Sequence, residues 1–114
     1  MSEDLPIQVE ISDMFVRRVR TLKKRYRNIR KDIEPVIQQL SMGEVLGDRI
    51  SGVEAEVYKV RVRNRDIQKG KSAGYRLIYY LQLETKIVLL TIYSKSDQSD
   101  ISDKDIREIL GGSS

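Results

Sequence analysis

The residues of this chain that could do chemistry are cations placed on or beside strand-like segments. Lys59 and Arg61 alternate with apolar residues between positions 58 and 63, and Arg76 stands at the start of an apolar run. Because side chains alternate faces along a strand, these cations would lie on the face opposite the apolar core residues. Arginine can bind two phosphate oxygens at once, and cations two residues apart on a strand repel each other. The pattern therefore indicates a site for a ligand that carries phosphate.

A basic loop bounded by glycines leads into Arg76. Gly70 and Gly74 allow backbone angles that other residues avoid, and the small Ser72 and Ala73 between them leave room for a closely approaching ligand. The alternative is a plain hairpin connection, in which lysines keep the loop soluble and Arg76 is solvated. For the cations on the preceding strand, the alternative is an exposed edge that charge protects against aggregation.

Two absences narrow the chemistry further. The chain has no cysteine and no histidine, so disulfides, the common zinc sites and nucleophiles activated by histidine are excluded. Any catalysis must use Lys, Arg, Tyr, Asp or Glu, and we expect no metal ion and no other cofactor. The net charge of +4 and the isoelectric point near 9.4 make a polyanion a reasonable partner.

The length of 114 residues fits one domain with one modest core. We predict a single domain over residues 1–110 and a flexible tail over residues 111–114. The N-terminus is acidic and lacks the pattern of a secretory signal, and the longest apolar stretch, Ile87–Tyr93, is too short to span a membrane. The expectation is a soluble cytoplasmic protein.

The segments before the basic strand predict one strand and a helical hairpin. Residues 6–11 alternate apolar and polar positions, as in a half-buried strand with its isoleucine and valine side chains inward. Apolar positions then recur at helical spacing from residue 12 to about residue 28, and again from residue 32 to about residue 40. Pro35 would fall in the first turn of this second helix, where proline is tolerated.

The first of these helices and the connection after it are strongly basic. Nine Lys or Arg residues and no acidic residue lie between residues 17 and 31. Such a face repels itself, so a counter-surface is indicated, which would be an acidic protein, a nucleic-acid backbone or simple counterions. A solvated helix face is the alternative.

The second half of the chain predicts a sheet and a terminal helix. A strand over residues 56–65 is followed by a second over residues 75–83, and a short polar connection joins this to a central strand over residues 87–93. Ser102, with Asp105 three residues later, resembles a capping box at the start of a short helix.

Three parts of the chain together carry a family resemblance. They are the helical hairpin, the pairing of Tyr-Lys-Val-Arg-Val-Arg at residues 58–63 with Lys-Ser-Ala-Gly-Tyr-Arg at residues 71–76, and the strand that ends in Tyr-Ser-Lys-Ser-Asp at residues 93–97. With these parts the chain resembles the RelE/ParE superfamily of toxins from bacterial toxin-antitoxin systems, and most closely its HigB-like branch. The resemblance covers roughly residues 14–110.

The resemblance implies a small α+β fold, with two N-terminal helices packed on a twisted antiparallel sheet of four to five strands and a short C-terminal helix. Many members cut messenger RNA in the ribosomal A site and are silenced by an antitoxin, so mRNA, the ribosome and an antitoxin protein are the implied partners. We expect the antitoxin to cover the face that carries Lys59, Arg61 and Arg76, or the neighbouring helices.

The resemblance also assigns roles to residues. Lys59 and Arg61 match the basic strand positions of the active face, Arg76 matches the arginine of the Gly-Tyr-Arg segment, and Lys95 lies near the basic position after the last strand. The residues expected to bind RNA are Arg63, Arg65, Lys69, Lys71 and Tyr80.

Two positions depart from the best-known RelE members. Ser96 stands at about the position of a second arginine, and Ser102 at about the position of a tyrosine near the last helix. A tyrosine general base would then have to come from Tyr93 or Tyr80.

Catalysis without histidine is feasible on RNA because the nucleophile, the 2′-hydroxyl, belongs to the substrate. Arg61 and Arg76 would stabilise charge on the scissile phosphate. Neighbouring like charge disfavours the protonated form of a lysine, so Lys59 could act as base and Lys95 as acid. The alternatives are a ParE-like inhibitor of DNA gyrase, a basic nucleic-acid-binding module without catalysis, and a toxin relic that only binds its antitoxin or an operator complex.

Overall fold

The computed structural model describes residues 7–67 and 74–112 of the chain. These residues form an α+β structure, as predicted. In chain order the elements are β1 (Gln8–Ile11), α1 (Asp13–Lys23), α2 (Ile29–Ser41), β2 (Asp48–Arg49), β3 (Val57–Val62), β4 (Tyr75–Leu83), β5 (Lys86–Ser94) and α3 (Asp103–Gly112). None of the helices described is long and apolar enough to cross a bilayer.

The five strands form one mixed sheet in the order β1-β5-β4-β3-β2. Neighbouring strands from β2 to β5 are antiparallel, but β1 pairs with β5 in parallel, so the prediction of an antiparallel sheet was wrong at the first strand. Alternation of apolar and polar residues predicts a strand but not the direction of its partner. Ile11, expected inward, is the last residue of β1 and is 48% exposed.

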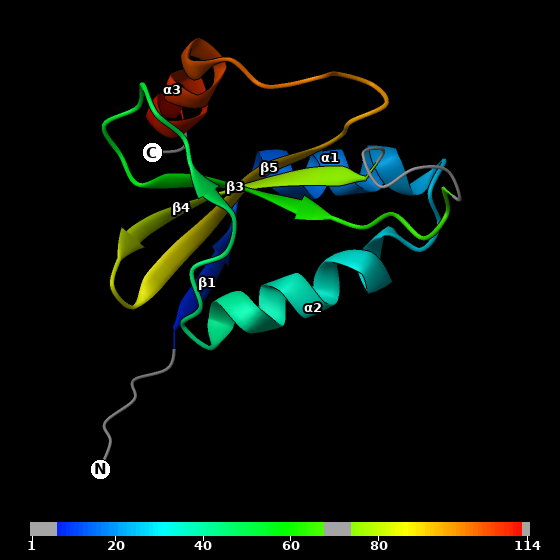
Figure 1. Ribbon diagram of the computed structural model, residues 1–114, viewed down its shortest axis with the longest axis horizontal. Coiled ribbons are helices and arrows are strands. Elements are labelled where there is room, and N and C mark those ends of the chain that lie inside the picture. Colours follow the sequence, from blue (N-terminus) through cyan, green and yellow to red (C-terminus); the bar gives the residue numbers. More distant parts are fainter. Residues whose placement is uncertain (1–6, 68–73, 113–114) are drawn as a thin grey trace.

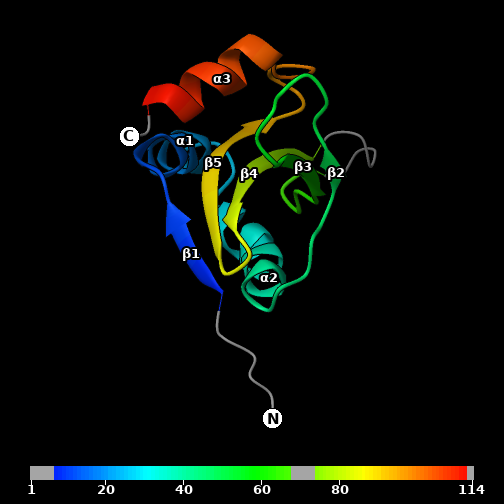
Figure 2. The same cartoon turned by 90° about the vertical axis from the view of Figure 1, so that its left-hand side faces the viewer.

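Helices cover both faces of the sheet. Figure 1 shows α3 on one side and α2 on the other, and Figure 2 shows α1 beside β5. Phe15 of α1 and Ile33 of α2 share a core cluster with Leu77 of β4. Ile106 of α3 packs in a second cluster with Ile78, the next residue of β4. Successive residues of one strand thus serve two cores, as the alternation of side chains requires.

The first helix is shorter than its apolar spacing predicts. The N-cap Ser12 holds its start, because Ser12 Oγ accepts a hydrogen bond from the Phe15 N–H (3.0 Å) and donates one to the Leu90 carbonyl of β5 (2.8 Å). The helix ends at Lys23, well before the predicted residue 28. A turn follows in which Tyr26 still packs against the core, so the apolar stripe continues although the helix does not.

The second helix begins at Ile29, earlier than the predicted residue 32, so Pro35 lies inside the helix and not in its first turn. A proline there removes the donor that would reach the Lys31 carbonyl, and both residues are exposed, so water can serve that carbonyl. The early start is fixed by a distant loop. The backbone N–H and side-chain amide of Asn28 donate to Asp66 at 2.9 and 2.8 Å.

Strands β3 and β4 approach each other closely where the candidate site begins. A β-carbon on Gly74 would stand 2.3 Å from the Val62 carbonyl oxygen, so glycine is needed there to make room for β3 itself. The sequence interpretation was wrong to give Gly74 unusual backbone angles, because Gly74 is not among the described glycines with positive φ. Ser72 and Ala73, which were expected to leave room for a ligand, lie outside the described residues. The strand predicted to reach Arg65 ends at Val62, which leaves Arg63 and Arg65 beyond the sheet.

The terminal helix begins as predicted, with the Asp105 N–H donating to Ser102 Oγ at 3.1 Å. It runs to Gly112, past the expected start of the tail at residue 111. Its buried Ile106 covers the part of the second sheet face near Ile78 and Val88. The rest of that face carries the candidate functional residues.

Candidate functional site

The strand cations identified in the sequence meet on the face of the sheet that α3 partly covers. Arg61 of β3 lies directly opposite Arg76 of β4, and Arg76 lies opposite Tyr93 of β5. Lys59 stands two residues before Arg61 and shares its face. Residues opposed across neighbouring strands have β-carbons about 5 Å apart, and like charges placed there repel each other. We call Lys59, Arg61 and Arg76, with the neighbouring Tyr93, the cationic row. The row concentrates positive charge that a polyanion can neutralise.

A β-bulge brings Tyr93 to this row. The pairing of β4 with β5 shifts between Ile78 and Tyr79, where Leu90 is the extra residue of β5. Leu89, before the shift, packs in the cluster under α1 and α2. After the shift Ile92 packs in that same cluster, and Tyr93 lies on the opposite face, toward α3. With strict alternation from Leu89, Tyr93 would have faced the cluster under α1 and α2. Bulges that redirect a side chain are common beside functional sites.

Arg76 differs from the solvated residue of the plain-hairpin interpretation. It is only 5% exposed, and its Nη1 donates a hydrogen bond to the carbonyl of Tyr75 at 3.2 Å. A guanidinium keeps its charge when buried. The site therefore contains a fixed positive charge between the exposed Arg61 and the buried ring of Tyr93.

The Tyr93 hydroxyl is a hydrogen-bond donor in this structure. Burial, strengthened by the negative charge of Asp100, raises the pKa of Tyr93 to about 12, although the charge of Arg76 acts in the opposite direction. The phenol is consequently neutral near pH 7, and its hydroxyl donates to Asp100 Oδ1 at 3.4 Å. The prediction that Tyr93 substitutes as a general base is not favoured by this environment.

Asp100 is a site residue that the sequence interpretation missed. Its Oδ1 accepts hydrogen bonds from Lys59 Nζ (3.0 Å), from the Tyr93 hydroxyl and from the Ile101 N–H (2.8 Å). The hydrogen bond from Lys59, followed by the one from the Ile101 N–H, lowers the pKa of the Asp100 carboxyl group. Asp100 stands in a run of serine, aspartate and glutamine that is typical of a connecting loop, so no local signal identified it.

Other predicted RNA-binding residues lie outside the row. Arg65 turns toward α2, where its backbone N–H (3.1 Å) and Nε (2.7 Å) donate to the buried carboxylate of Asp32. Arg63 is exposed just after β3 and has no ion-pair partner among the described residues. Lys69 and Lys71 lie outside the described residues.

Lys95 and Tyr80 border the row on different sides. Lys95 follows β5 directly, and its Nζ donates to the Ser99 carbonyl at 3.0 Å, so it braces the loop that carries Asp100. Tyr80 shares the face of Arg76 but stands four residues further along β4, about 13 Å away, and packs against the α3 cluster. Neither contacts the opposed pair Arg61 and Arg76 through a hydrogen bond that the described residues show.

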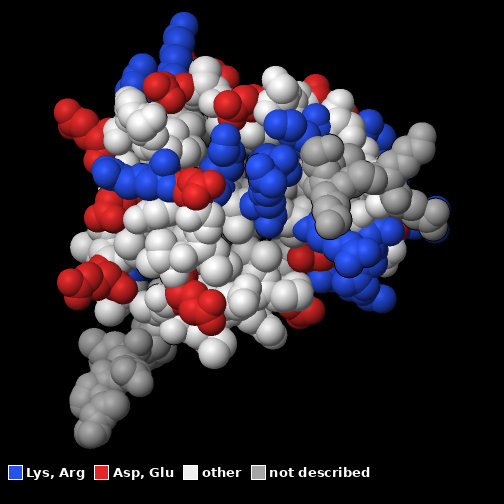
Figure 3. All heavy atoms as spheres, viewed as in Figure 1, with Lys and Arg blue, Asp and Glu red and all other residues white. Residues whose placement is uncertain are grey.

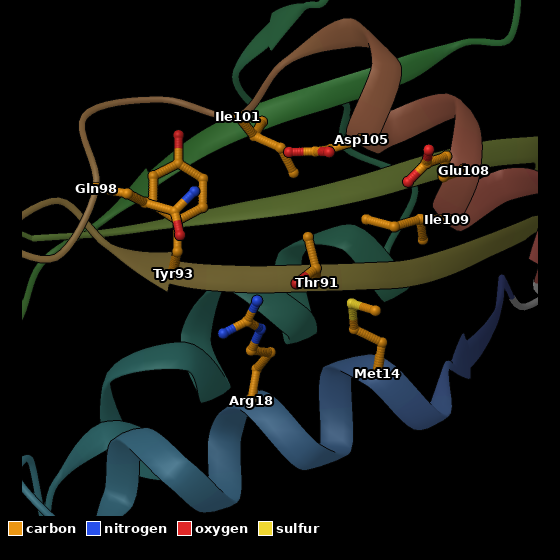
Figure 4. A pocket seen from close by; sticks show the side chains of 9 residues that line it. All are labelled: Met14, Arg18, Thr91, Tyr93, Gln98, Ile101, Asp105, Glu108 and Ile109. Carbon is orange, nitrogen blue, oxygen red and sulfur yellow. The ribbon is translucent and has the colours of Figure 1, made fainter.

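A pocket of about 350 Å³ opens next to the site, between α1, β5 and α3. Figure 4 shows Tyr93 and Thr91 of β5 along its base, with Arg18 of α1 on one side and Asp105 and Glu108 of α3 on the other. Tyr93 thus belongs both to this pocket and to the cationic row.

The surroundings of the row are basic. On the face shown in Figure 3, the largest groups of Lys and Arg atoms lie from the centre toward the right, where β3 ends in the same view of Figure 1. Across residues 7–67 and 74–112, no group of three or more His, Cys, Asp or Glu residues could hold a metal ion. The chemistry that these side chains offer is binding and stabilisation of anionic oxygen.

The comparison with known protein families gives one match. A family model described as the RelE toxin of the RelE/RelB toxin-antitoxin system matches residues 12–111. The matched region runs from the N-cap of α1 to the last turn of α3, so it includes every described residue of the cationic row and Asp100.

Proposed function

The chain belongs to the RelE family of toxins from toxin-antitoxin systems, and from this membership we propose that it is a ribosome-dependent endoribonuclease that cleaves messenger RNA. The observation that carries the proposal is the row of Arg61, Arg76 and Tyr93 across three neighbouring strands. RNA supplies its own nucleophile in the 2′-hydroxyl. The protein must align that oxygen with phosphorus and stabilise the charge of the transition state.

The side chains divide this work by their chemistry. Arg61 and Arg76 would bind the two non-bridging oxygens of the scissile phosphate, as planar guanidinium groups do well. The neutral hydroxyl of Tyr93 would donate to the same phosphate or to a sugar oxygen. The sequence interpretation assigned the proton of the 2′-hydroxyl to Lys59, but Lys59 Nζ donates to the Asp100 carboxylate, so Lys59 is assigned to binding of the phosphate instead. Water would take the proton of the 2′-hydroxyl, and Lys95 would deliver a proton to the leaving 5′-oxygen.

The test is induced expression followed by primer extension on an abundant transcript. We expect growth arrest and new in-frame 5′ ends from the wild type, and loss of both with Arg61→Ala, because removing one preorganised donor typically costs on the order of 10²-fold in rate. Arg61 is exposed, so its replacement spares the fold better than replacement of the buried Arg76. Arg20→Ala removes the same charge from α1 and should retain cleavage.

Three outcomes would contradict the proposal. Arrest without cleavage would favour the gyrase-inhibitor alternative, and no arrest would favour a binding protein or a relic. Cleavage that survives Arg61→Ala and Lys59→Met would remove the row from the active site. Purified protein with and without ribosomes carrying a defined codon in the A site then tests ribosome dependence.

The antitoxin partner that the family implies is proposed to use a groove between α1 and α2. The groove contains the buried Phe15 and Ile33 and the outward Val16, which is 41% exposed. Arg20 and other exposed cations stand at its margins. An apolar channel with basic margins is complementary to an amphipathic helix whose apolar stripe is flanked by acidic residues.

This docking can be tested apart from cleavage. Val16→Glu should leave the toxin active but free it from neutralisation by the co-expressed antitoxin, because a carboxylate in the groove repels an acidic helix. Val45→Glu is the matched control, since Val45 is also an exposed valine but lies in the loop after α2. Equal neutralisation of both variants would place the antitoxin elsewhere, with the cationic row as the next candidate.

A further inference from the structure

The carboxylate of Asp100 is held by a set of donors suited to an anionic oxygen. A lysine ammonium, a phenolic hydroxyl and a backbone N–H all point at the single atom Oδ1, at 3.0, 3.4 and 2.8 Å. Lys59 and Tyr93 come from strands on either side of β4, and the Ile101 N–H comes from the loop that carries Asp100. Three donors converging on one oxygen are the arrangement that proteins also use for a phosphate oxygen.

The cations near Asp100 Oδ1 also resemble the surroundings of a bound phosphate. The opposed pair Arg61 and Arg76 lies on the same face of the sheet, two residues along β3 from Lys59. A carboxylate can satisfy Lys59 and Tyr93, but it leaves the exposed Arg61 without an ion-pair partner among the described residues. A phosphodiester has two non-bridging oxygens, so it could accept hydrogen bonds both from Lys59 and Tyr93 and from the arginine pair.

We infer that Asp100 Oδ1 occupies a phosphate-oxygen subsite formed by Lys59 and Tyr93, and that an RNA phosphodiester must displace this carboxylate to reach them. The inference rests on the proposed function for its ligand. In the free protein, the Asp100 carboxylate would block the donors that bind the RNA phosphate. Asp100 thereby lowers the affinity of the free protein for RNA without being part of the chemistry.

Displacement requires only a local movement. The Asp100 side chain is 63% exposed, so its ion pair with Lys59 is a surface pair that competing anions can replace. The loop around it has other anchors, because Asp97 pairs with Arg25 in the turn after α1 and Lys95 donates to the Ser99 carbonyl. Helix α3 stays attached through the buried Ile106.

The loop also provides a matched control. Asp97 and Asp100 stand three residues apart, and replacing either with asparagine changes the net charge by the same single unit. Asp97 contacts Arg25 in the turn after α1 and not the cationic row. A general electrostatic gain in RNA affinity will appear in both variants, whereas release of the subsite will appear only at Asp100.

The experiment measures binding of a short 2′-O-methyl RNA, which cannot be cleaved, by fluorescence anisotropy at fixed salt. We expect Asp100→Asn and Asp100→Ala to bind about three- to fivefold more tightly than Asp97→Asn, the range that the loss of one exposed ion pair allows. In a Lys59→Met background, the difference between the Asp100 and Asp97 replacements should vanish. Thermal melts confirm that each variant is folded.

Equal affinity of the Asp97 and Asp100 variants would overturn the inference, and weaker binding on loss of Asp100 would show that it positions Lys59 and Tyr93 instead. Absence of RNA binding by the Asp100 variants would overturn it as well. Because the probe has no free 2′-hydroxyl, the result is independent of catalysis. A positive binding result together with absence of cleavage in cells would reject the proposed nuclease and keep the subsite.

Discussion

The two faces of the sheet are built from alternate residues of the same strands, yet they differ in composition. On the face of α1 and α2, Leu77 is buried in one apolar cluster. On the face of α3, an apolar cluster around Ile78 borders a row in which Arg61 and Arg76 oppose each other. Packing stabilises the first face, whereas the row places like charges together at a cost in stability. The difference is the reason for assigning the proposed phosphate site to the face of α3.

The replacement with the largest expected effect removes a packed side chain from the face of α1 and α2. Leu77→Ala should destabilise the protein by about 3 to 5 kcal/mol, because the side chain is fully buried in the central part of the sheet. Urea unfolding at pH 7 measures the loss. A cost under about 1 kcal/mol would contradict the view that this face supplies the main stability.

The next test concerns Asp32 of α2, whose carboxylate is buried. Asp32→Asn should cost about 2 kcal/mol, because Asp32 accepts hydrogen bonds from the backbone N–H and Nε of Arg65. Asp66→Asn is the control on an exposed carboxylate that contacts Asn28, and should cost less. The same unfolding assay applies, and equal losses would show that burial of Asp32 adds nothing.

On the site face, the environment of Tyr93 should appear in alkaline unfolding. Its folded pKa of about 12 lies above the ordinary tyrosine pKa of about 10, so the neutral phenol favours the folded state, and this contribution is full below pH 10. It is lost as the pH rises from 10 to 12, and the loss reaches about 1 to 2 kcal/mol at pH 11. Comparison of the wild type with Tyr93→Phe between pH 9 and 11 isolates Tyr93 from the other tyrosines. A parallel decline of both proteins would contradict the assignment.

The smallest effect should have the opposite sign. Arg61→Leu should stabilise the protein by about 0.5 kcal/mol, because it removes repulsion from Arg76 directly across the strands. The gain should shrink at high salt, which screens exposed charges. Destabilisation by this replacement would show that Arg61 contributes to the fold, and the contrast between the two faces would weaken.

Local patterns predicted much of this structure. The apolar run of β4 and the Ser102 cap of α3 were confirmed because both signals are contained in a few consecutive residues. The early start of α2 was missed because it depends on Asp66, which is distant in sequence from Asn28. The parallel pairing of β1 was missed for the same reason.

The site was predictable in its cations and not in its other parts. Lys59, Arg61 and Arg76 were identified from alternation along their strands, and the pairing of β3 with β4 brings two of them face to face. The burial of Arg76 was not predictable, because alternation separates the two faces of the sheet without showing how deeply a side chain on either face is covered. Asp100 was missed because its partners lie on other strands.

The pairing of β1 with β5 has a consequence for synthesis of the protein. The last residue of β1, Ile11, pairs with Leu89, and the cap that follows joins Ser12 to Leu90, residues 78 positions apart. The first strand to leave the ribosome must therefore wait for the last one. At roughly 5 to 20 residues per second, this delay is on the order of 4 to 16 seconds. A prematurely terminated chain could not close the sheet, so a cell that makes this toxin would be exposed to it only once translation is almost complete.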